Sequence, residues 1–141
     1  ASKRLVTVTA DINVREAAAQ LADPGIDLLT VVDADGAMAG IVTDTDIVKW
    51  VASRQSPLDT LEVTAGDLMT KVVFSCTPDQ SLASVVGRAA DRGLKHFPIV
   101  DENNKPIGVV YIQRALIALD KENQLSAQHL LEYIGGAGNR W

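Results

Sequence analysis

The segment Val31-Val32-Asp33 returns as Ile99-Val100-Asp101, and subtracting 33 from 101 gives an offset of 68 residues. With no gap allowed, the same offset pairs further identical residues: Lys3 with Lys71, Thr9 with Thr77, Asp11 with Asp79, Ala22-Asp23 with Ala90-Asp91, Gly25 with Gly93, Gly40 with Gly108 and Val42 with Val110. An internal repeat indicates the architecture more directly than a single motif, because each copy must form one folding unit. The sequence therefore predicts a duplicated unit, and a cleft between two similar halves is a natural place for a ligand.

The composition is typical of a globular protein that binds neither nucleic acid nor membranes. Of the 141 residues, 47% are hydrophobic and 22% are charged, which suits a folded core. The net charge of −5 comes without a concentrated basic face, which disfavours nucleic-acid binding. No apolar stretch approaches the roughly 20 residues of a membrane span. The single cysteine, Cys76, has no partner for an internal disulfide, so we interpret it as a small buried residue and expect a cytoplasmic protein.

Each copy has the hydrophobic pattern of a βαββα unit, which predicts a mixed α/β fold. In the first copy we expect a strand at 5–8, a helix at 14–21 capped by Asn13, strands at 28–32 and 38–42, and a helix from Thr43 to about Arg54. In the second copy we expect strands at 72–74, 97–100 and 107–110, a helix at 82–92 capped by Ser81, and a last helix that ends at Asp120.

The repeat boundaries divide the chain into residues 1–60, residues 61–123 and a C-terminal part, 124–141. The last part holds an amphipathic helix at Ser126–Ile134 and a tail. The segment Gly66-Asp67-Leu68-Met69-Thr70 leads into the second copy, and its counterpart would precede residue 1. We therefore expect the first copy to lack this lead-in segment.

The strongest local signal for a binding site is Gly40-Ile41-Val42-Thr43-Asp44-Thr45-Asp46, where a strand runs directly into a helix. The backbone N–H groups of the helix start and the Thr43 hydroxyl can hold a phosphate. The carboxylate of Asp46, three residues later, can accept hydrogen bonds from both hydroxyls of a ribose. The same residues also fit a plain helix start, since Thr often caps a helix and Asp favours the first turn without any ligand.

Together, several features resemble a tandem pair of cystathionine-β-synthase (CBS) domains over residues 1 to about 120. They are the duplicated order of elements, the Val-Val-Asp and Ile-Val-Asp segments, the Gly-h-h-Thr-x-x-Asp turn (h, apolar) and Asp67-Leu68-Met69-Thr70. The resemblance implies two βαββα repeats packed about a pseudo-twofold axis, called a Bateman module. It also implies a regulatory role, because such modules bind AMP, ADP, ATP, S-adenosylmethionine or related ligands, act on a partner protein and form dimers.

The resemblance also assigns residues to a nucleotide site. By position, Thr43 and Asp46 hold the phosphate and the ribose, and Gly40 permits close packing of the turn. The adenine side comes from the other copy: Thr77, Leu94, His96 and Pro98, with Lys95 beside His96 offering positive charge to phosphates. Taken alone, His96 is more typical of a packed or solvent-facing histidine.

The second copy departs from this motif, with Tyr111 and Arg114 at the positions of Thr43 and Asp46. A cation does not accept hydrogen bonds from a ribose diol. Arg114 can instead bind a phosphate or a carboxylate of a partner, and Tyr111 can stack on a base or fill the cleft. We therefore expect one competent site and an altered or blocked second site.

Neither metal binding nor catalysis is supported. The pairs Asp33/Asp35 and Asp44/Asp46 lack the additional oxygen ligands of a divalent cation site. The sequence has no convincing set of nucleophile, base and orienting residue, so we expect neither an enzyme nor a catalytic cofactor. Two hypotheses remain open: a stand-alone regulatory module that senses an adenine nucleotide or related adenosyl ligand, and a ligand-free structural or dimerisation module.

We further expect a homodimer and a regulated partner protein that the sequence does not identify. The apolar helix faces are rich in small and branched residues, which suits close helix packing between chains. The faces that we expect in the dimer interface are Val14, Ala17, Ala18 and Leu21, or their counterparts Leu82, Val85, Val86 and Ala89.

Overall fold

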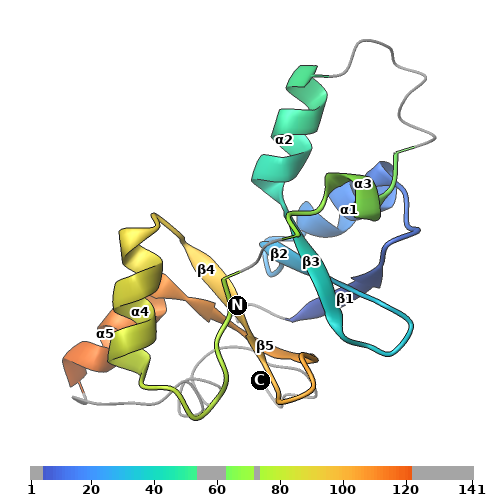
Figure 1. Ribbon diagram of the computed structural model, residues 1–141. Helices are drawn as coiled ribbons and strands as arrows, with labels where there is room; N and C mark the ends of the chain where they lie inside the picture. Colours follow the sequence, from blue (N-terminus) through green and yellow to red (C-terminus); the bar gives the residue numbers. More distant parts are fainter. Residues whose placement is uncertain (1–4, 54–62, 72–73, 122–141) are drawn as a thin grey trace. The chain divides into compact units, whose positions relative to one another are not determined.

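The computed structural model describes residues 5–53, 63–71 and 74–121 (Figure 1). Contacts between residues divide the chain into two compact parts, called here the first unit, which ends at Val73, and the second unit, which begins at Phe74. Both are mixtures of helices and small sheets, which confirms the predicted mixed α/β class. None of the helices in the described ranges is long and apolar enough to cross a lipid bilayer.

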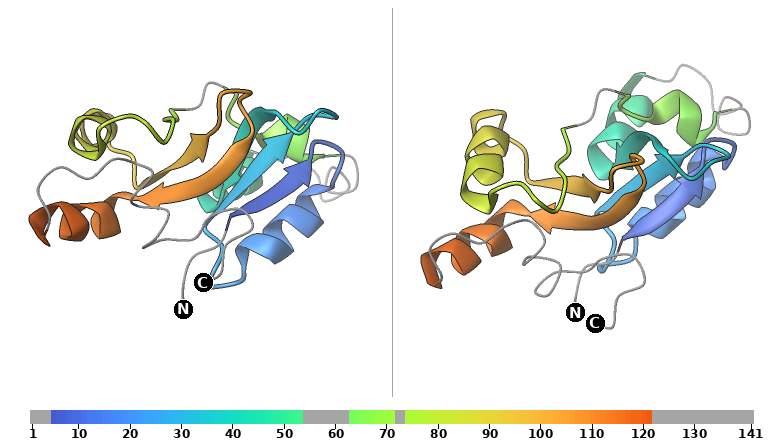
Figure 2. Two further views of the ribbon diagram at one scale, coloured as in Figure 1. Left: turned by 90° about the horizontal axis from the view of Figure 1, so that it is seen from below. Right: turned by 60° about the horizontal axis from the view of Figure 1, so that its bottom comes forward.

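The first unit contains a three-stranded sheet in the order β1-β2-β3. Its elements are β1 (Val6–Thr9), α1 (Val14–Leu21), β2 (Leu28–Val32), β3 (Met38–Thr43), α2 (Asp44–Ser53) and α3 (Ala65–Leu68). Strand β1 is parallel to β2, and β3 is antiparallel to it. Helix α1 lies along one face of this sheet and also contacts α2 and α3 (Figure 2).

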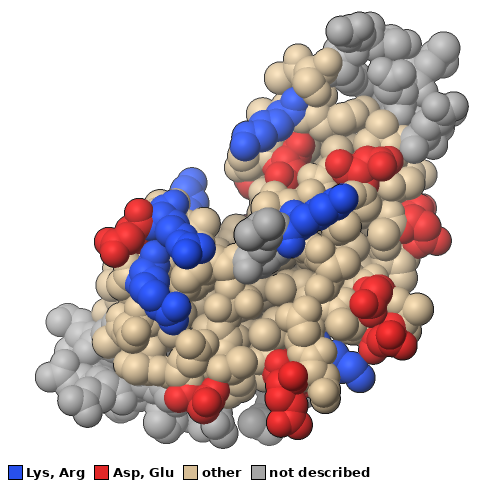
Figure 3. Space-filling model, viewed as in Figure 1, with Lys and Arg blue, Asp and Glu red and all other residues tan. Residues whose placement is uncertain are grey.

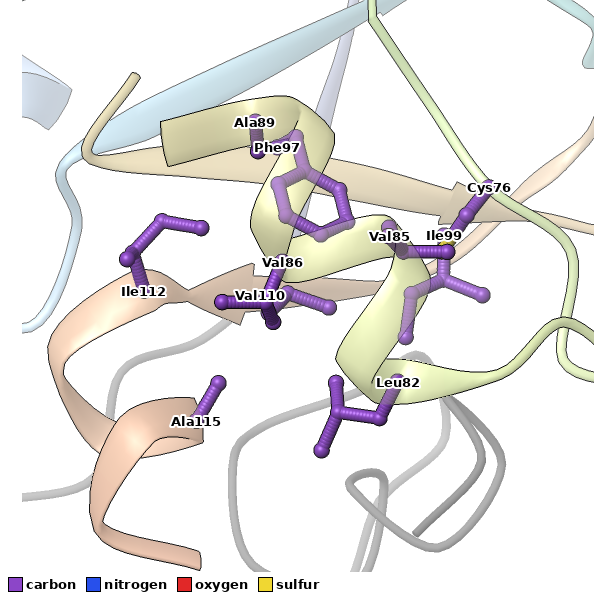
Figure 4. Packing of buried hydrophobic residues seen from close by; sticks show 10 residues of the cluster. All are labelled: Cys76, Leu82, Val85, Val86, Ala89, Phe97, Ile99, Val110, Ile112 and Ala115. Atoms are coloured by element: carbon purple, nitrogen blue, oxygen red, sulfur yellow. The ribbon is translucent and has the colours of Figure 1, made fainter. Parts of the chain in front are cut away.

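The second unit contains a two-stranded hairpin covered by two helices. Its elements are α4 (Leu82–Asp91), β4 (His96–Val100), β5 (Pro106–Tyr111) and α5 (Ile112–Lys121). Figure 4 shows Val85 and Val86 of α4 lying against Phe97 of β4 and Val110 of β5. Ala115 of α5 belongs to the same buried cluster, so both helices contribute to one small core.

The two units have the same strand register, displaced by the 68-residue offset of the sequence repeat. Leu28 pairs with Thr43 in the first unit, and His96 pairs with Tyr111 at the corresponding place in the second. Both hairpins also carry an irregularity at the same position, one residue before the paired strand ends. A single parallel bridge, Cys76 to Ile99, corresponds to the pairing of β1 with β2. The duplication predicted from the sequence is therefore confirmed at the level of hydrogen-bonded pairs.

Local capping agrees with the expected helix starts. The side chain of Asn13 accepts a hydrogen bond of 2.9 Å from the Glu16 N–H at the start of α1. Ser81 does the same for the Ser84 N–H at the start of α4. After α4 the chain reaches Gly93 with φ of +70°, a conformation that glycine adopts without strain and that ends the helix.

Two expected elements need comment. The strand expected at 72–74 falls partly outside the described residues, and Phe74 belongs to no strand. Among the described residues of this segment, from 74 to 80, Cys76 is the one that pairs with the sheet. The amphipathic helix expected at Ser126–Ile134 lies entirely outside the described residues.

The expected dimer faces of α1 and α4 are largely occupied within their own units. Val14 is 2% exposed and Ala17 is fully buried in the first unit. Leu82, Val85 and Ala89 are fully buried in the second, where they pack on the hairpin. An apolar helix face indicates burial but not the surface that covers it, and here the covering surface is the unit's own sheet. The location that we predicted for the dimer interface is therefore wrong.

Candidate functional site

The junction of β3 and α2 places Thr43 and Asp46 in direct contact. Strand β3 ends at Thr43 and α2 begins at the next residue, so Asp46 lies in the first helical turn. The Thr43 N–H donates to Asp46 Oδ2 at 2.9 Å, and the Thr43 hydroxyl donates to the same oxygen at 3.3 Å. The two residues that the sequence pattern singled out therefore form one hydrogen-bonded pair.

A third residue, Thr70, completes this group. Its hydroxyl donates to Asp46 Oδ1 at 3.3 Å, across 24 residues of sequence. Thr70 is held there because its backbone exchanges two hydrogen bonds with Ile41 of β3, of 2.8 and 3.1 Å. The sequence reasoning missed this role, because the lead-in segment was assigned to the start of the second copy. In the structure α3 and the residues that follow it pack within the first unit.

The absence of a side chain at Gly40 allows Thr70 to lie close to β3. A Cβ atom added at Gly40 would lie 2.7 Å from the Thr70 carbonyl oxygen and 2.8 Å from Met69 Sδ. Both distances are shorter than real Cβ contacts, and the first is to backbone, which yields little. Gly40 is itself buried, so its role is to admit the segment that carries Thr70.

The first unit offers an internal comparison for the Thr-x-x-Asp pair. At the start of α3 the Thr64 N–H and hydroxyl donate to Asp67 Oδ2 at 3.0 and 3.1 Å, in the same arrangement as Thr43 and Asp46. These bonds, the backbone one first, lower the pKa of the Asp67 carboxyl from its ordinary value of 3.8. At the start of α3 the pair is thus a capping box. Asp46 differs because it is half-buried and because Thr70 binds its second oxygen.

The first turn of α2 is acidic, and two backbone N–H groups at this helix start, those of Thr43 and Thr45, are already engaged. Asp44 and Asp46 both lie in this turn. The Thr45 N–H donates to Asp44 Oδ1 at 2.9 Å, and the Thr43 N–H is bound by Asp46. This helix start therefore has less capacity for a phosphate than an uncapped one, since carboxylates occupy donors and add negative charge.

The remaining predicted residues belong to the second unit, where His96 and Pro98 lie in β4 and Thr77, Leu94 and Lys95 lie beside it. Thr77 precedes α4, where its N–H donates to Gln80 Oε1 at 2.9 Å. The neighbouring Cys76 N–H donates to the Pro98 carbonyl at 3.3 Å, which places Thr77 near the Pro98 part of the strand. Just before β4, the backbone carbonyl of Lys95 accepts from the Ile112 N–H at 2.9 Å, and Leu94 packs partly buried against the core.

His96 and Tyr111 form a pair of rings in the second unit. Their centroids are 5.9 Å apart and the ring planes are nearly perpendicular, at 83°. Tyr111 is only 8% exposed, whereas Thr43 at the corresponding position is half-buried. Arg114 lies half-buried in the first turn of α5, at the position of Asp46. The structure thus places His96, assigned to the first site, beside Tyr111 of the second.

The cysteine and the acidic side chains give no sign of a reactive thiol or a metal site in the described residues. Cys76 is 2% exposed, and burial raises the pKa of its thiol to about 12, which keeps it protonated at neutral pH. This agrees with its interpretation as a small core residue. Within the described ranges, His, Cys, Asp and Glu side chains form no group of three that could hold a metal ion.

Comparison with known proteins identifies relatives for both units. A family model described as "CBS domain" matches residues 1–53 and 65–121. A homoserine O-acetyltransferase of Methanosalsum zhilinae is 34% identical over 106 residues, which are 75% of this chain and 20% of that protein. An uncharacterised 17.7 kDa protein of Acidianus ambivalens is 27% identical and is covered over 81% of its length. The chain spans about a fifth of the length of the acetyltransferases that it matches.

Two solved structures have the same fold over most of this chain. The CBS domain pair of protein MJ0100, in complex with 5′-methylthioadenosine and S-adenosyl-L-methionine, is 27% identical with a TM-score of 0.70. The similarity covers 85% of this chain and 90% of that one. A CBS-domain protein of Agrobacterium tumefaciens is 30% identical with a TM-score of 0.69, covering 82% of this chain and 90% of the other.

Proposed function

The chain belongs to the CBS domain family, and on this basis we propose that it is a regulatory module that binds an adenosine-containing ligand. The observation that carries the proposal is the carboxylate of Asp46, which is half-buried and bound by Thr43 and Thr70 on its two oxygens. The MJ0100 domain pair, which is similar over 85% of this chain, was solved with two adenosyl ligands.

We assign the ribose to Asp46. A carboxylate can accept about four hydrogen bonds, and the described residues supply three. The Thr43 and Thr70 hydroxyls rotate freely about their C–O bonds, so both oxygens of Asp46 can accept the ribose hydroxyls while the Thr43 N–H keeps the side chain in place. Threonine hydroxyls turned outward then bind the sugar oxygens as donors or acceptors.

The negative charge of the first turn of α2 favours some adenosine-containing ligands over others. Asp44 and Asp46 give this turn two carboxylates, and the N–H groups of Thr45 and of Thr43, which precedes the helix, are engaged. A triphosphate beside these carboxylates is repelled, whereas a neutral or cationic adenosyl compound is not. We therefore infer that 5′-methylthioadenosine or S-adenosylmethionine fits the first unit better than ATP.

We propose that the second unit lacks an equivalent site. Tyr111 fills the position of Thr43 with a buried ring that packs on His96, and Arg114 replaces the acceptor Asp46. Neither residue reproduces the diol acceptor. One ligand per chain follows, with Gly40, Thr43, Asp46 and Thr70 on its ribose side. The assignment of Thr77, Leu94, Lys95, His96 and Pro98 to an adenine stays a prediction from the sequence.

The proposal includes no catalytic activity. The match to the acetyltransferases is confined to about a fifth of their length, so their reaction is not carried over to this chain. Regulation instead follows from differential binding: a ligand shifts the population toward the arrangement that it binds more tightly.

A second candidate function is a structural module without a ligand. It is favoured by Asp67, which has the same bonds as Asp46 at a helix start where they serve only as a cap. A thermal-shift screen with AMP, ADP, ATP, S-adenosylmethionine, 5′-methylthioadenosine and NAD(H) separates the two candidates, because a ligand that binds the folded state raises its stability. We expect the two low-charge adenosyl compounds to raise the melting temperature most. No shift with any compound at millimolar concentration supports the structural module.

A further inference from the structure

The second unit carries two arginines that converge on one aromatic ring. The guanidinium carbon of Arg92 lies 5.0 Å from the centroid of Phe74, and that of Arg88 lies 5.7 Å from it. The ring of Phe74 is held by Phe97, whose ring packs edge-on at 5.1 Å. Both arginines are exposed, whereas Phe74 is half-buried against the core. We call Phe74, Arg88 and Arg92 the arginine–phenylalanine cluster.

The fold does not require this cluster, because the first unit is built on the same frame without it. The 68-residue offset places Val6, Gln20 and Pro24 at the positions of Phe74, Arg88 and Arg92. The first unit therefore has neither the ring nor the two charges. A favourable interaction of Arg88 with the end of α4 accounts for one cation near a helix C-terminus, but it does not account for two cations on one ring.

The cluster is positively charged, whereas the protein as a whole is negatively charged. The whole chain has a net charge of −5. In Figure 3 the blue side chains gather over α4, whereas red side chains predominate on the visible face of the first unit. Within the described part of the chain, no carboxylate forms an ion pair with Arg88 or Arg92. Among the described residues, the two positive charges are therefore not neutralised by an ion pair.

We propose that the arginine–phenylalanine cluster is a docking surface for an acidic helical segment of a partner protein. A guanidinium stacked on a ring is held in one orientation and keeps its N–H edge for a planar carboxylate, which it binds with two parallel hydrogen bonds. Arg88 lies in the last turn of α4 and Arg92, four residues later, is the C-cap of that helix, so the two side chains leave the same end of α4 about one turn apart. A partner helix with Glu or Asp at positions i and i+4 presents two carboxylates at the same spacing.

This inference is independent of the ligand site of the first unit. Its test uses a fluorescein-labelled, alanine-based helical peptide of about 20 residues, long enough to form a helix alone, with Glu pairs at i and i+4. A second peptide has the same composition with the Glu residues at i and i+2. The protein variants are Arg88→Gln/Arg92→Gln and the charge-matched control Lys49→Gln/Lys105→Gln, whose lysines are exposed elsewhere. Circular dichroism verifies that both variants are folded.

We expect fluorescence anisotropy at low salt to show tighter binding of the i, i+4 peptide than of the i, i+2 peptide. The arginine variant should weaken that binding about tenfold, and the lysine control about twofold or less, since two exposed charge pairs contribute of the order of 1 kcal/mol together. An Arg88→Lys/Arg92→Lys variant should recover only part of the affinity. Equal losses in the arginine variant and the lysine control contradict the proposal. So does arginine-dependent binding of inorganic phosphate or of anionic phosphatidylserine vesicles when neither peptide binds.

Discussion

Asp46 and Asp67 have the same bonds to a threonine three residues earlier, yet their surroundings differ. Asp67 lies exposed at the start of a short helix, whereas Asp46 is half-buried and bound by Thr70 from another segment. The comparison separates Asp67, which belongs to a capping box alone, from Asp46, whose carboxylate we propose as a ligand acceptor. At the scale of single residues, the proposed site therefore depends on Thr70 as much as on the motif.

The cap of α3 makes a testable contribution to the pH dependence of stability. Because Thr64 lowers the pKa of Asp67 in the folded state, the stabilisation is fully present above its ordinary value of 3.8 and is lost as the pH falls through the lower folded value. Asp67→Asn should therefore lower the melting temperature at about pH 6, and the difference from the wild type should shrink as the pH falls through the lowered pKa of Asp67 in the folded state. Thermal unfolding across this range, followed by circular dichroism, measures it. A pH-independent difference would contradict the assigned cause.

At the scale of elements, the pairing of the Thr70 segment with β3 depends on the absence of a side chain at Gly40. Gly40→Ala places a methyl group 2.7 Å from the Thr70 carbonyl, so the segment must move away. We expect a loss of about 1–3 kcal/mol in the free energy of unfolding, as for other overpacked sites. Urea unfolding measures this change.

Gly87 in α4 is the matched control for this substitution. A Cβ at Gly87 meets no atom within 4 Å, so Gly87→Ala should stabilise the protein by about 0.5–1 kcal/mol through helix propensity. If both alanine variants change the free energy of unfolding in the same direction, close packing at Gly40 is not the reason for the glycine.

The elements also show how far the sequence determines the fold. The repeat predicted the order of elements, and its 68-residue offset carries over to every hydrogen-bonded pair of the two hairpins. Capping chemistry placed the starts of α1 and α4, because Asn13 and Ser81 act within one helical turn. The role of Thr70 could not be read in the same way, since it depends on a contact between segments 24 residues apart.

Surfaces built from segments that are distant in the sequence could not be predicted from the sequence either. The arginine–phenylalanine cluster joins Phe74 to a helix that begins several residues later, and no periodic pattern connects them. The faces of α1 and α4 were recognised as apolar, but the pattern did not reveal that their own sheets cover them. Local signals in the sequence are thus reliable within a turn or a strand, and contacts between segments require the structure.

At the scale of the whole molecule, the surface for self-association remains a proposal, now on different helices. Val48 and Val51 on α2 are 65% and 49% exposed, and Leu116 and Ile117 on α5 are 53% and 56% exposed. Large apolar side chains at equivalent helices of both units are typical of an interface. We expect a homodimer in light scattering at tens of micromolar, and a monomer for Val48→Asp/Leu116→Asp, since two buried carboxylates oppose association.

A charge-matched substitution of exposed polar residues on the same helices, Ser53→Asp/Gln113→Asp, serves as the control and should leave the dimer intact. A wild-type protein that stays monomeric over this concentration range argues against the interface. So does a Val48→Asp/Leu116→Asp variant that remains dimeric.

The claim that Asp46 recognises a ribose is central to the proposed function, and titration calorimetry with adenosine and 2′,3′-dideoxyadenosine tests it most directly. A charged hydrogen bond of this kind contributes about 1.5–3 kcal/mol, so the wild type should bind adenosine roughly ten- to hundredfold more tightly than the dideoxy compound. Asp46→Ala should remove this preference, whereas Asp67→Ala, which loses an equivalent cap, should retain it. Equal affinity of the wild-type protein for the two nucleosides would contradict the claim and leave Asp46 as a helix cap alone.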